Sequence, residues 1–305
     1  MANGSVVMAR IVLRALRQAL QSTGISASKN RSGAIVEACP TPGLQTMLRI
    51  PLVDVFVLVW FVVCWAGYAL FAWRRSGTRA SLVVAMRIYR RHWFKRMLGN
   101  DNRIGDIAAL NSLLSSSTFF ASTSLLILGG LVALLGTPER VIDVVENLPF
   151  TRHDSELVWH IKIILMIGVF IYAFFKFTWS IRQFNFCAVL IGAAPKSDGP
   201  DEHEDFVDAI VSVASFSEEA FNHGLRAFYF ALAVLSWFLH PWLFVFASAL
   251  VVYVLYRREF HSKALFALTN PNSVTQVFRL PERMMAELRL GERPVSWRKD
   301  WLDRE

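Results

Sequence analysis

Cysteine is scarce in this sequence, and the few cysteines present are far apart. The chain of 305 residues contains three of them, Cys39, Cys64 and Cys187. No CxxC pair or other ligand spacing occurs, so neither a disulfide framework nor a zinc site is indicated. The HExxH and paired ExxH patterns of metal sites and the GxSxG turn of serine hydrolases are also missing. We therefore expect no metal and no cofactor, and no motif marks the chain as an enzyme.

Acidic residues are also few relative to basic ones. Asp and Glu number 24 against 32 Lys and Arg, which gives a formal net charge of +8. The basic residues lie beside long apolar segments, where positive charge marks the cytoplasmic side of a membrane and attracts anionic lipids. We therefore expect a bilayer with anionic lipids as a partner of this chain, and no nucleic acid.

Long apolar segments are what the sequence has in abundance. Hydrophobic residues make up 54% of the chain, and the mean hydropathy is +0.39. A helix needs about 20 mostly apolar residues to cross a bilayer. Segments that meet this requirement cover residues 52–73, 103–136, 157–182 and 225–256.

The last of these segments is too long for one span. Its 32 residues would reach about 48 Å as a helix, whereas the hydrocarbon core is about 30 Å thick. Leu239, His240 and Pro241 interrupt it, and proline suits the first turn of a new helix. We predict two spans joined by a tight external turn, with Trp237 and Trp242 in the interfacial belt. One kinked helix is the alternative.

Two amphipathic helices are predicted outside the spans. The first follows residue 73 in a strongly basic loop and presents Arg87, Arg91 and Lys95 to anionic headgroups. The second begins near Asp201 with an acidic stripe and runs into the segment that starts at residue 225. Because the loop 137–156 is acid-rich, we place it outside and the basic loop in the cytoplasm.

Together these patterns predict an all-α fold, a transmembrane helix bundle of about five spans with cytoplasmic amphipathic helices. Residues 47–261 form this bundle, with the amino end outside and the carboxyl end in the cytoplasm. Residues 1–46 are rich in Arg and Ser and poor in acids, which is typical of a disordered or cleavable extension, a transit peptide included. A start at Met47 is also open. Residues 262–305 are a cytoplasmic tail, with a short helix over 280–290.

The segment 103–136 carries a regular face of small residues. The sequence places one every seven residues, at Ala108, Ser115, Ser122, Gly129 and Gly136. Small residues let membrane helices approach closely, and hydroxyls can bond across the contact. We predict that this is the central helix of the bundle and that it packs through this face. The alternative is that the serines line a hydrated path.

Ionisable residues inside the spans are the candidate functional groups, because charges in a membrane are costly. Lys162 and Lys176 lie 14 residues apart on nearly one face of the third segment. The favoured interpretation is that both lysines snorkel to water. The alternative is an anion or proton path along this helix, in which Asp54 pairs with Lys162 on the outer side and Glu218 or Glu219 pairs with Lys176 on the inner side.

A second polar group follows along the next helix. Glu219, Asn222, His223 and Arg226 share one helical face where the chain enters the membrane. Glu219 and His223 could supply two metal ligands, but two ligands do not make a site. The favoured interpretation is a structural network with residues of the basic loop, which are Arg96, Asp101 and Asp106.

Three stretches of the chain resemble a known family. They read RRHWFKRMLGNDNRIGDIAALNSLLSSSTFFASTSLLILGGLVALLG, FNHGLRAFYFALAVLSWFLHPW and YRREFHSKA. Residues from about Met47 to His261 resemble the uncharacterised membrane-protein family catalogued as domain of unknown function 599. The resemblance implies a polytopic membrane protein, with no activity and no catalytic residue to carry over.

The favoured function is therefore a structural or accessory helix-bundle subunit, which assembles in the membrane with itself or with another membrane protein. The alternative is a small transporter or channel that moves an anion or a proton along the lysine-bearing face. A membrane enzyme is a third interpretation. The location expected is the bacterial inner (plasma) membrane.

Overall fold

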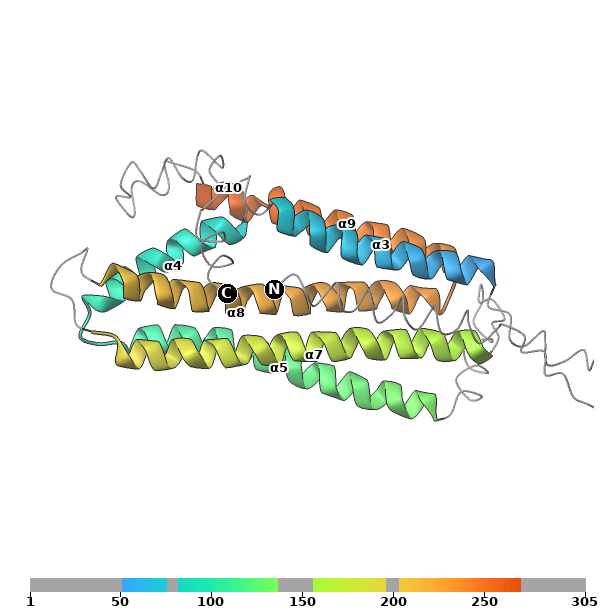
Figure 1. Ribbon diagram of the computed structural model, residues 1–305, viewed down its shortest axis with the longest axis horizontal. Helices are drawn as coiled ribbons and strands as arrows, with labels where there is room; N and C mark the ends of the chain where they lie inside the picture. The colour runs from blue at the N-terminus through green and yellow to red at the C-terminus, as the bar shows by residue number, and fades with distance from the viewer. Residues whose placement is uncertain (1–50, 76–81, 137–155, 196–202, 270–305) are drawn as a thin grey trace, which may run out of the picture.

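The computed structural model describes residues 51–75, 82–136, 156–195 and 203–269, and these residues form helices and short connections without strands (Figure 1). The helices are α3 (Leu52–Arg75), α4 (Leu82–Leu98), α5 (Ile104–Leu135), α7 (Glu156–Ala193), α8 (Glu204–Trp237), α9 (Pro241–Phe260) and α10 (Lys263–Thr269). The predicted all-α helix bundle is confirmed. The predicted extension 1–46, the external loop and the helix over 280–290 lie outside the described residues.

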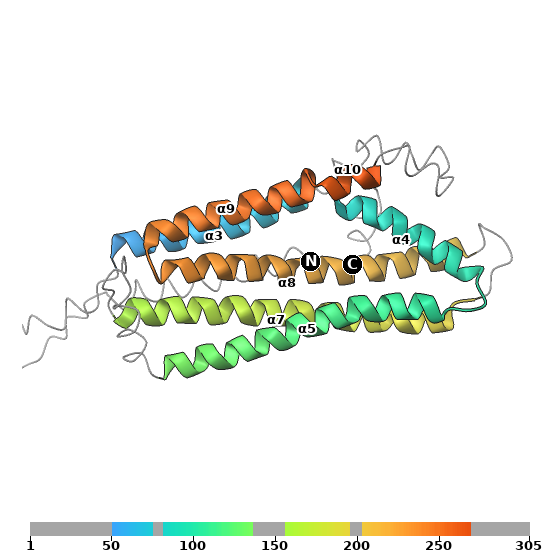
Figure 2. The same ribbon diagram turned by 180° about the vertical axis from the view of Figure 1, so that it is seen from behind.

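Helices α7 and α8 form the middle of the bundle. Helix α7 packs against α5 on one side and α8 on the other, and α8 in turn contacts α9 and α4. Helix α3 pairs with α9 at one end of the molecule, and α4 covers the other end of α8 (Figures 1 and 2). Helix α5 therefore lies at an edge, and the prediction that it is the central helix is wrong for the single chain.

The last apolar segment divides into two helices that run back along each other (Figure 1). The side chain of His240 accepts a hydrogen bond from the backbone N–H of Trp242, and Pro241 is the first residue of α9. The predicted pair of helices with a tight turn is confirmed, and the single kinked helix is wrong. Trp242 is exposed as expected of an interfacial residue, but Trp237 is buried in the protein.

Four helices are long and apolar enough to cross a membrane, namely α3, α5, α7 and α9. Helix α8 is not among them, although its second half contributes apolar residues to the bundle beside α7 and α9. Helix α7 has 38 residues and is about 57 Å long at 1.5 Å per residue. It continues 11 residues beyond the predicted end at residue 182, well past the thickness of a bilayer core.

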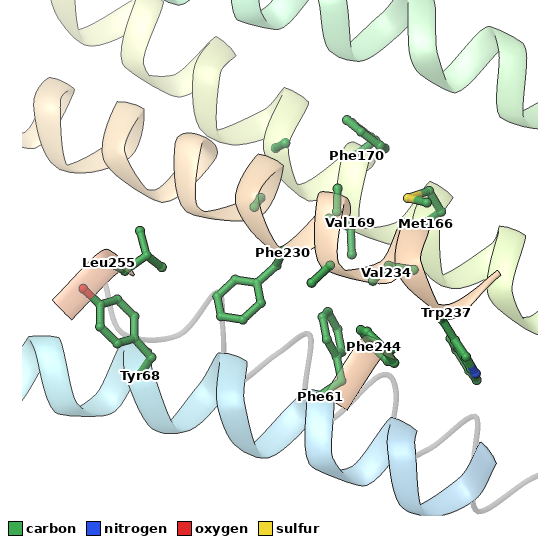
Figure 3. Packing of buried hydrophobic residues seen from close by; sticks show 14 of the residues in the cluster. Phe61, Tyr68, Met166, Val169, Phe170, Phe230, Val234, Trp237, Phe244 and Leu255 are labelled. Atoms are coloured by element: carbon green, nitrogen blue, oxygen red, sulfur yellow. The ribbon is translucent and has the colours of Figure 1, made fainter. Parts of the chain in front are cut away.

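Two apolar cores hold these helices together. The larger lies between α3, α5, α7, α8 and α9 and is rich in aromatic rings, such as the parallel pair Trp237 and Phe244 at 5.3 Å between centroids (Figure 3). The smaller lies where α4 packs over the ends of α7 and α8, around the buried Phe94 and Ile210. The first core belongs to the region of the membrane spans, and the second extends the bundle beyond it.

The predicted face of small residues, spaced every seven along α5, is not the side that packs against the rest of this chain. Ala108, Ser115, Ser122, Gly129 and Gly136 are all exposed, and a Cβ added at Gly129 would have no neighbour within 4 Å. Helix α5 instead contacts the bundle through the opposite side, where its buried residues are Leu110, Ser117, Ala121, Ser124 and Leu131. The prediction of the packing face was wrong because residue spacing shows which side chains share a face of a helix, but not whether that face points toward the bundle or away from it.

Candidate functional site

The first polar cluster lies at the predicted outer end of the bundle and joins α3, α7 and α8. The indole Nε1 of Trp237 donates a hydrogen bond to Asp54 Oδ1 at 3.1 Å. The ammonium of Lys162 donates to the backbone carbonyl of the same tryptophan at 2.9 Å. Asp54 is 1% exposed, and Lys162 and Trp237 are both 0% exposed. In place of the predicted ion pair, Trp237 links Asp54 to Lys162.

Lys162 caps the end of α8. The last carbonyls of a helix lack partners within the helix and carry partial negative charge, so an ammonium there is stabilising. Aromatic rings also surround the charge, with centroids of Trp159, Trp237 and Phe238 at 5.9, 5.4 and 5.6 Å from Nζ. Such cation–π contacts are strongest where water is excluded. The snorkelling interpretation is therefore wrong for Lys162.

Asp54 is less well satisfied than Lys162. Its Oδ1 accepts the indole hydrogen bond, whereas Oδ2 is buried without a hydrogen-bond partner among the residues that the structure describes. A buried polar atom without a partner is costly, and more so when it is charged. Asp54 is thus the weakest point of the outer cluster.

The second polar cluster lies at the predicted inner end of α3, joins α3, α8 and α9, and is called the inner cluster below. Arg226 Nη2 of α8 contacts Glu259 Oε2 of α9 at 3.0 Å. The hydroxyl of Tyr68 on α3 donates to the same carboxylate oxygen at 2.7 Å. Sequence reasoning found Arg226 but missed Tyr68 and Glu259. The signal for Glu259 was an acidic residue directly after two arginines at the end of the last apolar segment.

Glu218 and Glu219, the two carboxylates considered as partners of Lys176, contact other residues in the structure. Glu218 pairs with Arg90 of α4, so its predicted pairing with Lys176 is wrong. Glu219 attracts Lys176 through longer-range electrostatics, and its carboxylate lies 3.8 Å from His223 Nε2. Lys176, Glu219 and His223 are thus neighbours near the inner cluster, without a direct ion pair between Glu219 and the lysine.

A family model for the protein family of unknown function DUF599 matches residues 56–264, more than half of the chain. The chain belongs to this family. No curated protein matches the chain, and no solved structure does. The match includes Lys162, Lys176 and Glu259, whereas Asp54 precedes it by two residues. The DUF599 region therefore contains the whole inner cluster and two of the three residues of the outer one.

Helix α4 of this DUF599 chain is held by the acidic stripe of α8. Arg91 pairs with Glu204 and Asp208, and Lys95 also pairs with Glu204. The hydrogen bonds from Lys95 and Arg91 lower the pKa of Glu204 below its usual value. Burial lowers the pKa of Arg90 to about 10. The basic face that was expected on headgroups thus contacts α8.

The predicted network between α8 and Arg96, Asp101 or Asp106 stays a prediction. Asp106 accepts a hydrogen bond from Trp93 Nε1 at 2.6 Å, and Arg96 and Asp101 are exposed. Asn222 is half-buried beside His223. In the described ranges no three His, Cys, Asp or Glu side chains come together as a metal site would require.

Three buried serines link α5, α7 and α8. The hydroxyl of Ser180 on α7 lies 3.2 Å from those of Ser117 on α5 and Ser217 on α8, and Ser217 also donates to the carbonyl of Ser180 at 2.8 Å. All three are fully buried. Ser116 and Thr118 donate to carbonyls four residues earlier in their own helix. These hydroxyls serve packing.

Proposed function

We propose that this membrane protein is an assembly subunit that pairs through the outer face of α5, and that it does so in the bacterial inner membrane. The observation that carries the proposal is the direction of the small-residue face. Ser122 and Gly129 point away from the rest of the chain. Because lipid provides no hydrophobic drive for helix association, close backbone approach at small residues is the usual way in which such helices pair.

The shape of this face suits a second helix. Phe119 and Leu126 project from it with 65% and 79% of their surface exposed. They alternate along the helix with the small residues at 115, 122 and 129. Large side chains of one helix can therefore fit beside the small residues of another. A second copy of the chain offers the same surface in return.

The test is the mass of the purified protein in a mild detergent, for wild type, Gly129→Leu and Ser122→Leu. We expect an oligomer for wild type and a shift toward monomer for both variants, because a leucine would hold the helices apart. Ala249→Leu, at an exposed small residue of α9, is the matched control and should assemble like wild type. A monomeric wild type without a co-purifying partner, or equal assembly of all four proteins, would refute the proposal.

Transport of an anion or a proton along α7 is a second candidate function. It is favoured by the polar clusters that lie near the two ends of the membrane span of this helix. Lys162 is fully buried near one end of the span, and Lys176 is half-buried toward the other. Purified protein in liposomes should then dissipate a chloride or proton gradient faster than empty liposomes. Lys162→Met should abolish the difference. Equal leak rates with and without protein would count against transport.

A further inference from the structure

Lys176 differs from the other cations near the inner cluster. Arg90, Arg91 and Lys95 pair with carboxylates of α8, and Arg226 pairs with Glu259. Lys176 makes neither a hydrogen bond nor an ion pair to another residue that the structure describes, although its ammonium lies 5.6 Å from the centre of the Tyr172 ring. Its charge therefore remains available to an anion from outside the protein.

Other donors surround this ammonium. Tyr172 lies one helical turn before Lys176, and in the described part of the chain its hydroxyl has no hydrogen-bond partner. His223 lies opposite on α8. Tyr172, His223 and Arg226 line a small cavity together with Trp65, Tyr68, Ala69 and Phe230, and the cavity has about 10 Å³ of room for water. That is about the space of one water molecule, so a larger ligand would contact these side chains from the surface.

The position of this group matches the inner headgroup layer. Helices α3 and α7 run in the same direction, because Trp237 bonds both Asp54 and Lys162 at one end and Trp65 contacts Tyr172 further along. Lys176 therefore lies near the level of Tyr68, where α3 approaches its basic end. On α9 the exposed Arg257 and Arg258 mark the same boundary. Lipid phosphates are concentrated at this level, and basic pockets between helices bind such headgroups.

We propose that Lys176, with Tyr172 and His223 beside it, binds a phosphate group. An ammonium is a point charge that binds phosphate well, and the tyrosine hydroxyl and the imidazole N–H can donate to other phosphate oxygens. All three side chains are half-buried, so each still reaches the surface. The phosphate comes from an anionic lipid headgroup or from free phosphate. The site does not depend on pairing through α5.

The test compares two variants that each remove one positive charge from α7. Lys176→Gln removes the proposed ligand, and Arg182→Gln is the matched control, because Arg182 is exposed and stacks on Trp179 and Phe186 away from the site. Bound lipid is counted by native mass spectrometry after titration with short-chain phosphatidylglycerol or phosphatidylcholine. A parallel arm measures the shift in melting temperature with inorganic phosphate alone.

We expect wild type and Arg182→Gln to bind phosphatidylglycerol alike, and Lys176→Gln to bind about tenfold more weakly, which corresponds to about 1.4 kcal/mol. Lys176→Arg keeps the charge and should bind within a few-fold of wild type. Tyr172→Phe should weaken binding to a smaller extent. Stabilisation by inorganic phosphate that is lost in Lys176→Gln would identify free phosphate as the ligand.

Equal affinity of wild type and Lys176→Gln in both arms would overturn the proposal. So would an equal loss in Lys176→Gln and Arg182→Gln, since that indicates general charge attraction. If Lys176→Gln does not fold, the comparison of Tyr172→Phe with wild type decides, and unchanged affinity there overturns the proposal. The readout is lipid or phosphate binding, so failure here leaves the oligomer measurements on α5 untouched, and the reverse also holds.

Discussion

Gly224 is a point of close approach between α7 and α8 that a single added methyl group can test. A Cβ added at Gly224 would lie 2.6 Å from two ring atoms of Phe177 and 2.9 Å from a third. The ring has no room to move, because Phe177 is 0% exposed and is surrounded by other rings. The distances between ring centroids are 5.3 Å to Phe120, 5.6 Å to Phe221 and 5.7 Å to Phe228. We therefore expect Gly224→Ala to destabilise the bundle.

Two opposing effects set the size of this loss. Overpacking of a core costs about 1–3 kcal/mol, whereas replacing glycine by alanine inside a helix gains about 1 kcal/mol. The expected net loss is therefore about 0–2 kcal/mol. Gly130→Ala is the matched control, because Gly130 lies within α5 with no atom within 4 Å of an added Cβ. The difference between the two variants isolates the overpacking and should reach about 1–3 kcal/mol.

The assay is reversible unfolding in mixed micelles, with the free energy of unfolding measured for both variants. Phe177→Leu provides a further check, because a smaller side chain relieves the contact. The double variant should then lose less stability than the sum of the two single changes. If Gly224→Ala were stabilised as much as Gly130→Ala, the close approach of α7 and α8 at this position would be refuted.

Three further predictions concern charge and topology. Lys162→Met should lower the free energy of unfolding by about 1–3 kcal/mol, because it leaves the Trp237 carbonyl without its donor, and a more stable variant would contradict this. The ionised Glu204 stabilises the contact of α4 with α8 above its unfolded pKa, and this contribution is lost as pH falls through its lowered folded pKa. Acid should therefore lower the hydrogen-exchange protection factors of α4 amides, measured against the unfolded rate at the same pH, in wild type but much less in Glu204→Gln, and equal pH dependence would oppose the assignment. A reporter fused after Glu305 should read as cytoplasmic, because α9 returns toward the end that bears α4, whereas an external signal would reverse the topology.

The sequence alone was sufficient for the presence of the long helices and for the reversal between α8 and α9, but not for the end of α7, which lies 11 residues beyond the predicted one. Helix boundaries follow from local signals, such as the apolar length of a span or a proline at the first turn, and these signals need no knowledge of neighbours. The break at His240 and Pro241 is an example, since the cap is formed within three residues. The family resemblance and the membrane character followed from the same local information.

Only the tertiary structure determined which side chains and helix faces contact one another. The sequence placed Ser122 and Gly129 on one face, but the fold turned that face outward, because Ser117 and Ala121 on the other side contact α7. Glu218 lies within reach of several cations by spacing, yet it pairs with Arg90, since α4 packs along α8.

The outer cluster also separates what the sequence determined from what only the tertiary structure determined. Asp54 and Lys162 were recognised as costly charges in a membrane, but their link through Trp237 needed three helices to meet. Periodicity fixes which residues share a side of one helix, because it depends on the backbone alone. The direction of that side depends on packing against residues far away in the chain, and only the folded bundle contains that information.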